Sequence, residues 1–149
     1  MSVQTDRVFI QALQDSEAVT AIVGDRIYPV TIPGTDEEAE NEPPPYIVVM
    51  YDGFQNLYET KDNTFYGDED RVNISILVTA ESFDELNELV ELVRTSIDEW
   101  MLNYVAPEEG EDLSPLIPSA YDVTGSEKTY DWVKPCYQMT LKYNCDTDK

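Results

Sequence analysis

Residues 71 to 101 constrain the fold most, because two different periodicities follow one another there without a break. In the first part, "RVNISILVTA", large apolar residues alternate with polar ones, which is typical of a strand with one buried face. In the second part, Ser82 and Glu85 form the S-x-x-E pattern that caps the start of a helix. The apolar residues of this second part recur at steps of three or four: Phe83, Leu86, Leu89, Val90, Val93, Ile97, Trp100 and Met101. The segment therefore predicts a strand that is followed directly by a long amphipathic helix.

A run of prolines at residues 43–45 precedes a second predicted strand, from Tyr46 to Tyr51. Pro43 and Pro44 each bias the residue before them toward extended structure. The strand is apolar on both faces, so we expect it to lie inside a sheet that is covered on each side, or in an oligomer interface. The acidic stretch before the prolines, residues 35–42, lacks apolar residues that would anchor it, and we expect a mobile loop there.

The remaining predicted elements are shorter. Residues 4–14 indicate an amphipathic helix, residues 17–23 a second short helix that ends at Gly24, and "DRIYPV" a short edge strand. Residues 54–70 are polar but contain aromatic side chains, and we interpret them as a projecting arm. After the long helix, residues 105–116 form a second acidic loop, and two strands follow at about 119–124 and in "CYQMTLKYN".

This order of elements places strands at both ends of one long helix and shows no regular β-α-β alternation. It predicts an α+β fold, in which a mostly antiparallel sheet carries the long helix and the short N-terminal helix on one face. At 149 residues, the chain is most simply one domain, residues 1–149.

The charge of the chain excludes several classes of protein. Thirty-one Asp and Glu against nine Lys and Arg give a net charge of −22, and there is no His. Nucleic-acid binding needs Lys and Arg to displace counterions, and an anionic membrane attracts basic segments, so both classes are disfavoured. Two compatible interpretations remain. The carboxylates form a repulsive wall past which DNA slides, or the host keeps molar salt in its cytoplasm, which screens charges beyond about 3 Å.

Patterns that would indicate catalysis are missing from the sequence. Without His, Ser-His-Asp and Cys-His nucleophile systems and His-based metal sites are excluded. Asp68, Glu69 and Asp70 form the tightest group of carboxylates, which we interpret as a solvated acidic loop rather than a cation site. We therefore predict no enzyme activity, no catalytic residue, no metal and no cofactor. A small acidic enzyme with a carboxylate-bound metal, or a DNA-mimicking inhibitor, are the alternatives from other classes.

Cysteine, tryptophan and terminal patterns give further expectations. Cys136 and Cys145 lie nine residues apart on one predicted strand and so point to opposite faces, which predicts packing residues rather than a disulfide. We interpret Trp100 and Trp132 as core or subunit-interface residues rather than a ligand platform. The start of the chain contains no long apolar region, and no stretch reaches about 20 apolar residues, so we expect neither a signal peptide nor a membrane span.

Three stretches carry a resemblance to a known family. They are "AIVGDRIYPV" after the short helices, "PPPYIVV" after the acidic loop, and "VNISILVTAESFDELNELVELVRTSI". Over roughly residues 5–104 the chain resembles the tail-completion or tail-terminator family of tailed bacteriophages and related archaeal viruses. The strong acidity and the lengthened acidic loops depart from the family pattern, and they suggest a virus of a salt-loving host.

The resemblance implies a virion structural protein at the head–tail junction, assembled in the host cytoplasm. Such proteins form a ring, in this family a hexamer, that terminates the tail tube and joins it to the neck. The implied partners are other copies of the chain, the tail-tube protein and neck or connector proteins, while genomic DNA passes through the lumen without specific binding. A neighbouring neck connector or stopper protein is the alternative within the virion.

Four aromatic residues of the predicted arm are the candidate interface residues. Large rings among acidic and amide residues either fold back onto the core or dock on another subunit. We choose the second interpretation for Phe54, Tyr58, Phe65 and Tyr66.

Overall fold

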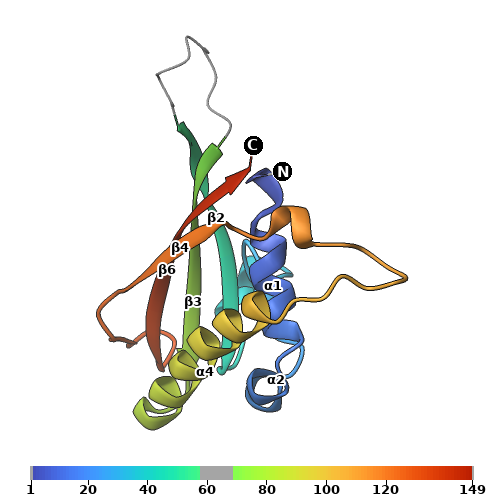
Figure 1. The fold of residues 1–149 in the computed structure, drawn as a ribbon. Helices are drawn as coiled ribbons and strands as arrows, with labels where there is room; N and C mark the ends of the chain where they lie inside the picture. The colour runs from blue at the N-terminus through green and yellow to red at the C-terminus, as the bar shows by residue number, and fades with distance from the viewer. Residues whose placement is uncertain (1, 58–68, 149) are drawn as a thin grey trace.

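A computed structural model describes residues 2–57 and 69–148 of the chain (Figure 1). In chain order, its elements are the 3-10 helix η1 (Ser2–Gln4), α1 (Asp6–Gln14), α2 (Glu17–Val23), β1 (Ile27–Pro29), α3 (Asp36–Glu40), β2 (Tyr46–Leu57), β3 (Glu69–Ala80), α4 (Phe83–Leu102), the 3-10 helix η3 (Ser114–Leu116), β4 (Ala120–Gly125), β5 (Thr129–Asp131) and β6 (Cys136–Asp148). The arm base and both termini lie at one end of the molecule, and the β5–β6 turn lies at the other end.

The strands form one sheet in the order β1-β2-β3-β6-β4, and β5 also pairs with β6. The pair β1–β2 is parallel, because the connection that contains α3 returns the chain to the starting end of β1. The pairs β2–β3, β3–β6, β4–β6 and β5–β6 are antiparallel. The predicted α+β class with a mostly antiparallel sheet is therefore confirmed.

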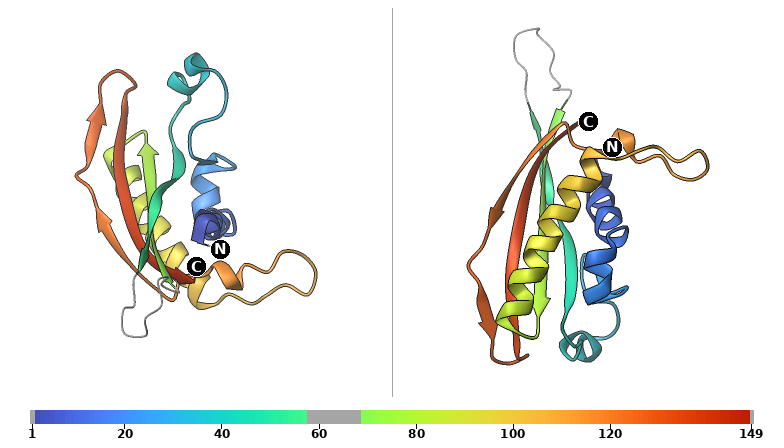
Figure 2. Two further views of the ribbon diagram at one scale, coloured as in Figure 1. Left: turned by 90° about the horizontal axis from the view of Figure 1, so that it is seen from above. Right: turned by 60° about the horizontal axis from the view of Figure 1, so that its bottom comes forward.

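Helices α1 and α4 pack on one face of the sheet (Figure 2). The predicted alternation in β3 is confirmed, because Val72, Ile74, Ile76 and Val78 are all fully buried beneath these helices. Phe9 of α1 packs against Tyr143 of β6, with ring centroids 5.0 Å apart. These contacts fix the N-terminal helix and the C-terminal strand to the same core.

The start of α4 follows the predicted cap. The Ser82 hydroxyl accepts a hydrogen bond from the Glu85 N–H (3.1 Å), and the Glu85 carboxylate accepts one from the Glu81 N–H (3.1 Å). The apolar series after the cap is buried from Leu86 to Ile97. Phe83, the first residue of α4, departs from the prediction: it is 49% exposed, and its ring packs against Tyr137 of β6.

The two acidic segments are more ordered than the sequence indicates. Within 35–42, the Thr35 hydroxyl accepts a hydrogen bond from the Glu38 N–H (3.2 Å) and caps α3. Acidic side chains in the first turn favour this helix through its dipole, so the expectation of a mobile loop is wrong for these residues. At the end of 105–116, Leu113 and Leu116 are buried against Val8 of α1, which anchors the second loop.

Strand β2 lies between β1 and β3, and its residues Tyr46 to Val49 are buried, which confirms the predicted place inside the sheet. The strand is longer than predicted and continues to Leu57, which pairs with Glu69 of β3. A register shift between Tyr51 and Gly53 interrupts this pairing, and Gly53 has a φ of +117°, which favours glycine. The base of the predicted arm is therefore a continuation of the sheet, in which β3 pairs with β2 on one side and with the end of β6 on the other.

Candidate assembly surfaces

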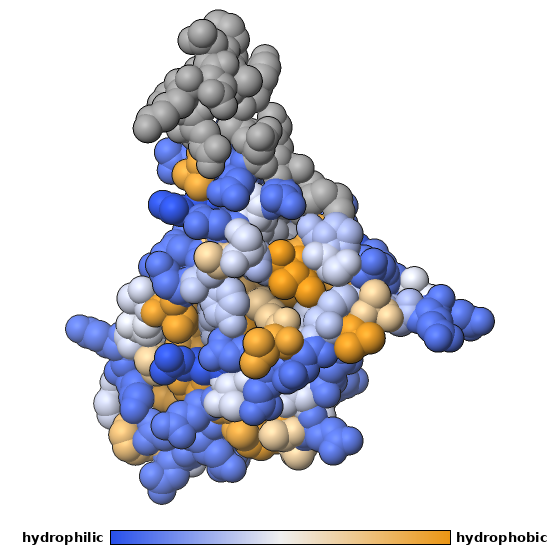
Figure 3. Space-filling model, in the orientation of Figure 1, coloured by the Kyte–Doolittle hydropathy of each residue, from blue (hydrophilic) through white to orange (hydrophobic). Residues whose placement is uncertain are grey.

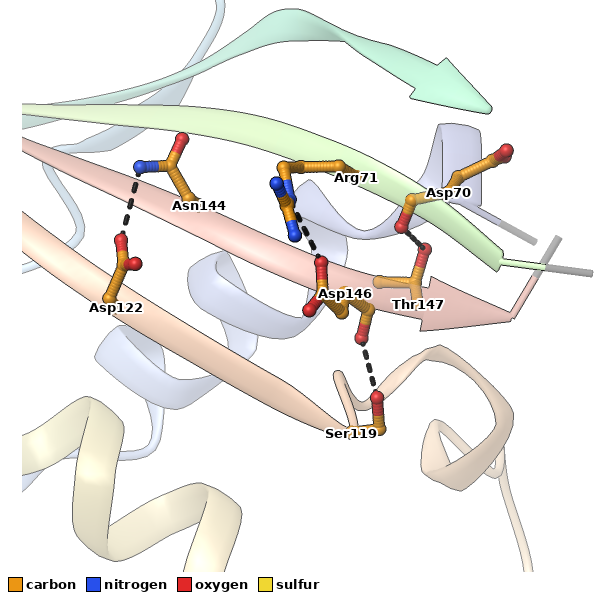
Figure 4. Close-up of polar contacts among 7 residues, drawn as sticks. All are labelled: Asp70, Arg71, Ser119, Asp122, Asn144, Asp146 and Thr147. Carbon is orange, nitrogen blue, oxygen red and sulfur yellow. Dashed lines mark hydrogen bonds and ion pairs between the residues drawn. The ribbon is translucent and has the colours of Figure 1, made fainter. Parts of the chain in front are cut away.

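The sheet face opposite α1 and α4 is polar near the arm (Figure 4). Arg71 Nε donates to Asp146 Oδ1 (3.1 Å), and Asn144 Nδ2 donates to Asp122 Oδ1 (3.0 Å). The Arg71 side chain is 51% exposed, and an ion pair of this kind contributes at most about 1 kcal/mol to stability. These polar contacts therefore form a solvent-exposed surface rather than an enclosed binding site.

Asp70 lies on the other face and corrects the interpretation of Asp68, Glu69 and Asp70 as a solvated loop. Its side chain is only 3% exposed, because it shares the inward register of Val72 in β3. Ser2 Oγ donates to its carboxylate, and Asn56 Nδ2 donates to its Oδ1 at 2.8 Å. Asp70 therefore ties the base of the arm to the N-terminus. Asp68 lies outside the described residues.

The carboxylates around Asp70 do not form a metal site in the described part of the chain. Within residues 2–57 and 69–148, no group of three or more His, Cys, Asp or Glu is placed to hold a metal ion. The cysteines of β6 are buried and free, as predicted. Burial raises the pKa of the Cys145 thiol to about 12, so the thiol stays protonated and weakly nucleophilic near neutral pH.

Of the four predicted interface residues, Phe54 is the one that the structure describes. It lies in β2 opposite Val72 and is 53% exposed, so it does not fold into the core. Tyr58, Phe65 and Tyr66 lie outside the described residues. The contact of these four residues with a neighbour stays a prediction.

A second exposed apolar group lies at the far end of the sheet from the arm. We call it the knob, and it consists of Phe83, Tyr130, Trp132, Val133 and Tyr137. Trp132 is 85% exposed and Val133 is 96% exposed. The Tyr130 ring packs edge-on against Trp132 at 4.6 Å and against Tyr137 at 4.9 Å. Trp132 is predicted to be a core or a subunit-interface residue. The structure excludes the core alternative, because Trp132 sits in the turn that joins β5 to β6, and the interface alternative stays a prediction.

Hydrogen bonds hold the knob in place. Asp131 Oδ1 accepts from the N–H of Val133 (2.9 Å) and from the N–H of Lys134 (3.3 Å). Lys134 Nζ donates to Ala39 O (3.2 Å) and to the Tyr46 hydroxyl (3.0 Å), and it lies 4.5 Å from the centroid of the Tyr46 ring. The turn therefore presents Trp132 and Val133 from a fixed backbone. Sequence analysis missed Val133, although large apolar residues within an Asp-initiated turn are a usable signal.

A hollow of about 520 Å³ lies near the other end of α4. Its apolar wall contains Trp100, Tyr104, Val105, Pro107 and Leu113, and its charged rim contains Arg7, Asp15, Glu109 and Glu111.

The walls of the hollow are also fixed by specific contacts. Trp100 Nε1 donates to Asp15 Oδ2 (2.8 Å), the Leu113 N–H donates to the Tyr104 hydroxyl (2.8 Å), and Arg7 pairs with Glu111. Trp100 is predicted to be a core or a subunit-interface residue, and it is partly buried against the core.

Elsewhere the apolar residues on the helix side form separate spots in a hydrophilic surface (Figure 3). None of the helices within residues 2–57 and 69–148 has the length and apolar character needed to cross a membrane.

Comparisons with known proteins relate this chain to a protein family and to a chain of a solved structure. The model of a protein family described as "Tail completion protein gp17" matches residues 7–113, which run from α1 into the second acidic loop. Among curated protein sequences, none matches this chain.

Among solved structures, one similar chain comes from a structure described as "Virion of native gene transfer agent (GTA) particle". The TM-score is 0.51 at 15% sequence identity, and the match covers 97% of this chain and 94% of the other, so the likeness concerns the fold. The family match spans more than half of the chain and assigns it to a virion tail. The chain belongs to the Tail completion protein gp17 family.

Proposed function

We propose that the chain forms a closed ring at the head–tail junction, where it ends the tail tube and joins it to the neck. The observation that carries this proposal is the family match over residues 7–113, because it spans the helices α1 to α4, the strands β1 to β3 and most of the second acidic loop. The fold shared with a chain of a gene transfer agent virion supports it at the level of architecture. We infer six subunits per ring, as the family resemblance implies.

The shape of the subunit supports a ring. The arm base lies at one end of the sheet and the knob at the other, so exposed apolar groups face in different directions. Contacts between unlike surfaces of identical subunits close into a ring when the rotation between them divides a full turn. We propose that Phe54 and the remaining arm aromatics, Tyr58, Phe65 and Tyr66, add to the contact with a neighbouring subunit or with the tail tube.

The charge supports passage of DNA through the lumen. A net charge of −22 per subunit gives a ring whose acidic side chains repel phosphates. Because tight binding to DNA depends on Lys and Arg that release counterions, a carboxylate-lined lumen lets the genome move without being held. The same charge suits a host with molar salt, in which self-repulsion between subunits is screened.

The test is polymerisation of the tail-tube protein in the presence and absence of the purified chain in 1 M KCl. Tube lengths are measured by electron microscopy. A terminator bound at the tube end is expected to shorten the tubes and to appear as a ring on one tip. If tube length stays the same and the chain binds the connector instead, the chain is a neck protein of the neighbouring kind. If it binds neither, the proposed function is wrong.

A further inference from the structure

We propose that the knob of one subunit docks into the hollow of the next copy of the chain, and that this contact closes the ring. The inference rests on the proposed function and specifies the surfaces through which the subunits associate.

The two surfaces lie at opposite ends of one rigid element. Phe83 of the knob is the first residue of α4, and Trp100 of the hollow lies near its last residue. A helix of 20 residues is about 30 Å long at 1.5 Å per residue. The knob therefore cannot reach the hollow of its own subunit. A contact between them is heterologous and extends from subunit to subunit in one direction.

The chemistry of the two surfaces matches. The knob offers Trp132 and Val133, and the hollow offers an apolar wall formed by Trp100, Tyr104 and Val105. Cavities of about 300–1,000 Å³ hold drug-sized ligands, so a hollow of about 520 Å³ has room for a Trp–Val pair. Val105 is 83% exposed, which leaves apolar surface for a partner to cover.

The local charges also match. Residues 126–135 contain Glu127 and Asp131 against Lys128 and Lys134, so this stretch is neutral in a chain of net charge −22. The rim of the hollow includes Glu109 and Glu111, and Arg7 already pairs with Glu111. Two strongly acidic copies can approach where one side is locally neutral. Lys128, whose Nζ lies 5.1 Å from the centroid of the Phe83 ring, is placed beside the knob to face an acidic rim.

The ordered turn lowers the cost of association. Asp131 and Lys134 hold the backbone of the knob before any partner binds. A side chain presented from a fixed backbone loses less conformational entropy on binding than one on a loose loop. Buried tryptophans at the centre of an interface commonly dominate its affinity. Trp132 is therefore the residue on which assembly should depend most.

The first test is disulfide trapping between copies of the full chain. Protein with Val133→Cys is mixed with protein with Val105→Cys in 1 M KCl and oxidised. We expect a cross-linked dimer, because the proposed contact brings these positions together. The matched control pairs Val133→Cys with Val3→Cys, since Val3 is also an exposed valine (63%) but lies outside the hollow. The native cysteines are buried in β6 and do not compete.

The second test measures assembly of Trp132→Ala and Val133→Asp by sedimentation, with Val3→Asp as the control. Both knob variants are expected to fold normally, because the replaced side chains are exposed. Subunit association is expected to weaken by about 30-fold or more for Trp132→Ala. Val3→Asp should assemble like the unmodified chain.

The outcomes separate the two proposals. If the unmodified chain forms rings and caps tubes, but the knob variants assemble normally and no cross-link forms, the docking contact is wrong and the proposed function stands. If the knob variants form rings but no longer bind the tail tube, the knob serves the tube protein and the inference is overturned. If the unmodified chain stays monomeric even with the tail tube present, both proposals fail.

Discussion

Asp131→Ala tests whether the knob depends on its ordered turn rather than on its apolar side chains alone. The change removes the Oδ1 that accepts hydrogen bonds from the N–H groups of Val133 and Lys134, and it leaves Trp132 and Val133 in place. A hydrogen bond in a protein contributes about 0.5–1.5 kcal/mol net, so the two bonds together hold the turn by about 1–3 kcal/mol. That free energy corresponds to a factor of about 5–150 in an equilibrium constant.

Two measurements follow from this magnitude. Amide hydrogen exchange at Val133 and Lys134 should lose protection by about this factor in Asp131→Ala. The concentration at which rings form should rise in the same direction, because the turn must then be ordered on binding. Asp131→Asn is the control, since its side-chain oxygen can still accept both bonds, and it should behave almost like the unmodified chain. If Asp131→Ala loses protection but assembles at an unchanged concentration, the ordered turn plays no part in docking.

Three further predictions concern the fold. Phe9→Ala should lower the free energy of unfolding by about 3–5 kcal/mol in urea titrations, because Phe9 is fully buried against Tyr143. The control Val3→Ala should change this free energy by no more than about 0.5 kcal/mol, because Val3 is exposed. If both variants lower the free energy of unfolding equally, α1 does not pack on the sheet. The thermal unfolding midpoint should rise steeply from low salt to 1 M KCl, because screening reduces repulsion in a chain of net charge −22; a flat profile contradicts the idea of a salt-loving host. Burial raises the pKa of the Cys145 thiol from 9.0 to about 12, so the thiol's contribution to stability is complete below pH 9 and is lost as the pH rises toward 12. The unfolding midpoint should therefore fall over this pH range, and thiol labelling of the folded protein at pH 8 should be slow. Rapid labelling at pH 8 refutes the buried site.

Much of the fold follows from local patterns in the sequence. The alternation in β3 and the three-to-four spacing in α4 report burial directly, because each period matches the geometry of its element. The amphipathic helix predicted at residues 4–14 corresponds to α1, in which Val8, Phe9, Ala12 and Leu13 are buried. Each of these segments has one clear apolar face. The spacing of its apolar residues shows whether the segment is a helix or a strand, and the apolar face is the one that packs against the core.

The structure departs from the sequence-based predictions where contacts between residues distant in the sequence determine the local structure. Asp70 is acidic and beside the arm, yet the pairing of β3 with β6 turns it toward Ser2 and Asn56. The parallel pairing of β1 and β2 depends on the path of residues 30–45, which local periodicity does not encode. Residues 35–42 form α3 in part because one hydroxyl of Thr35 caps it.

The candidate surfaces were only partly accessible to sequence reasoning. Aromatic residues among acidic ones indicated the arm, and Phe54 is indeed exposed there. The knob was missed as a unit, because Phe83 and Tyr137 are distant in sequence and meet only through the packing of α4 beside β6. The hollow likewise combines α1, the end of α4 and the second acidic loop.

A reconstruction of the virion at the junction between head and tail tests the central claim most directly. The account predicts a closed ring of this chain, with six copies, on the last layer of the tail tube and around the DNA channel. In that ring, Trp132 of each subunit should lie against Trp100 and Val105 of its neighbour. A density in which the chain appears as an isolated monomer on the particle surface, or is absent from the junction, would contradict the account.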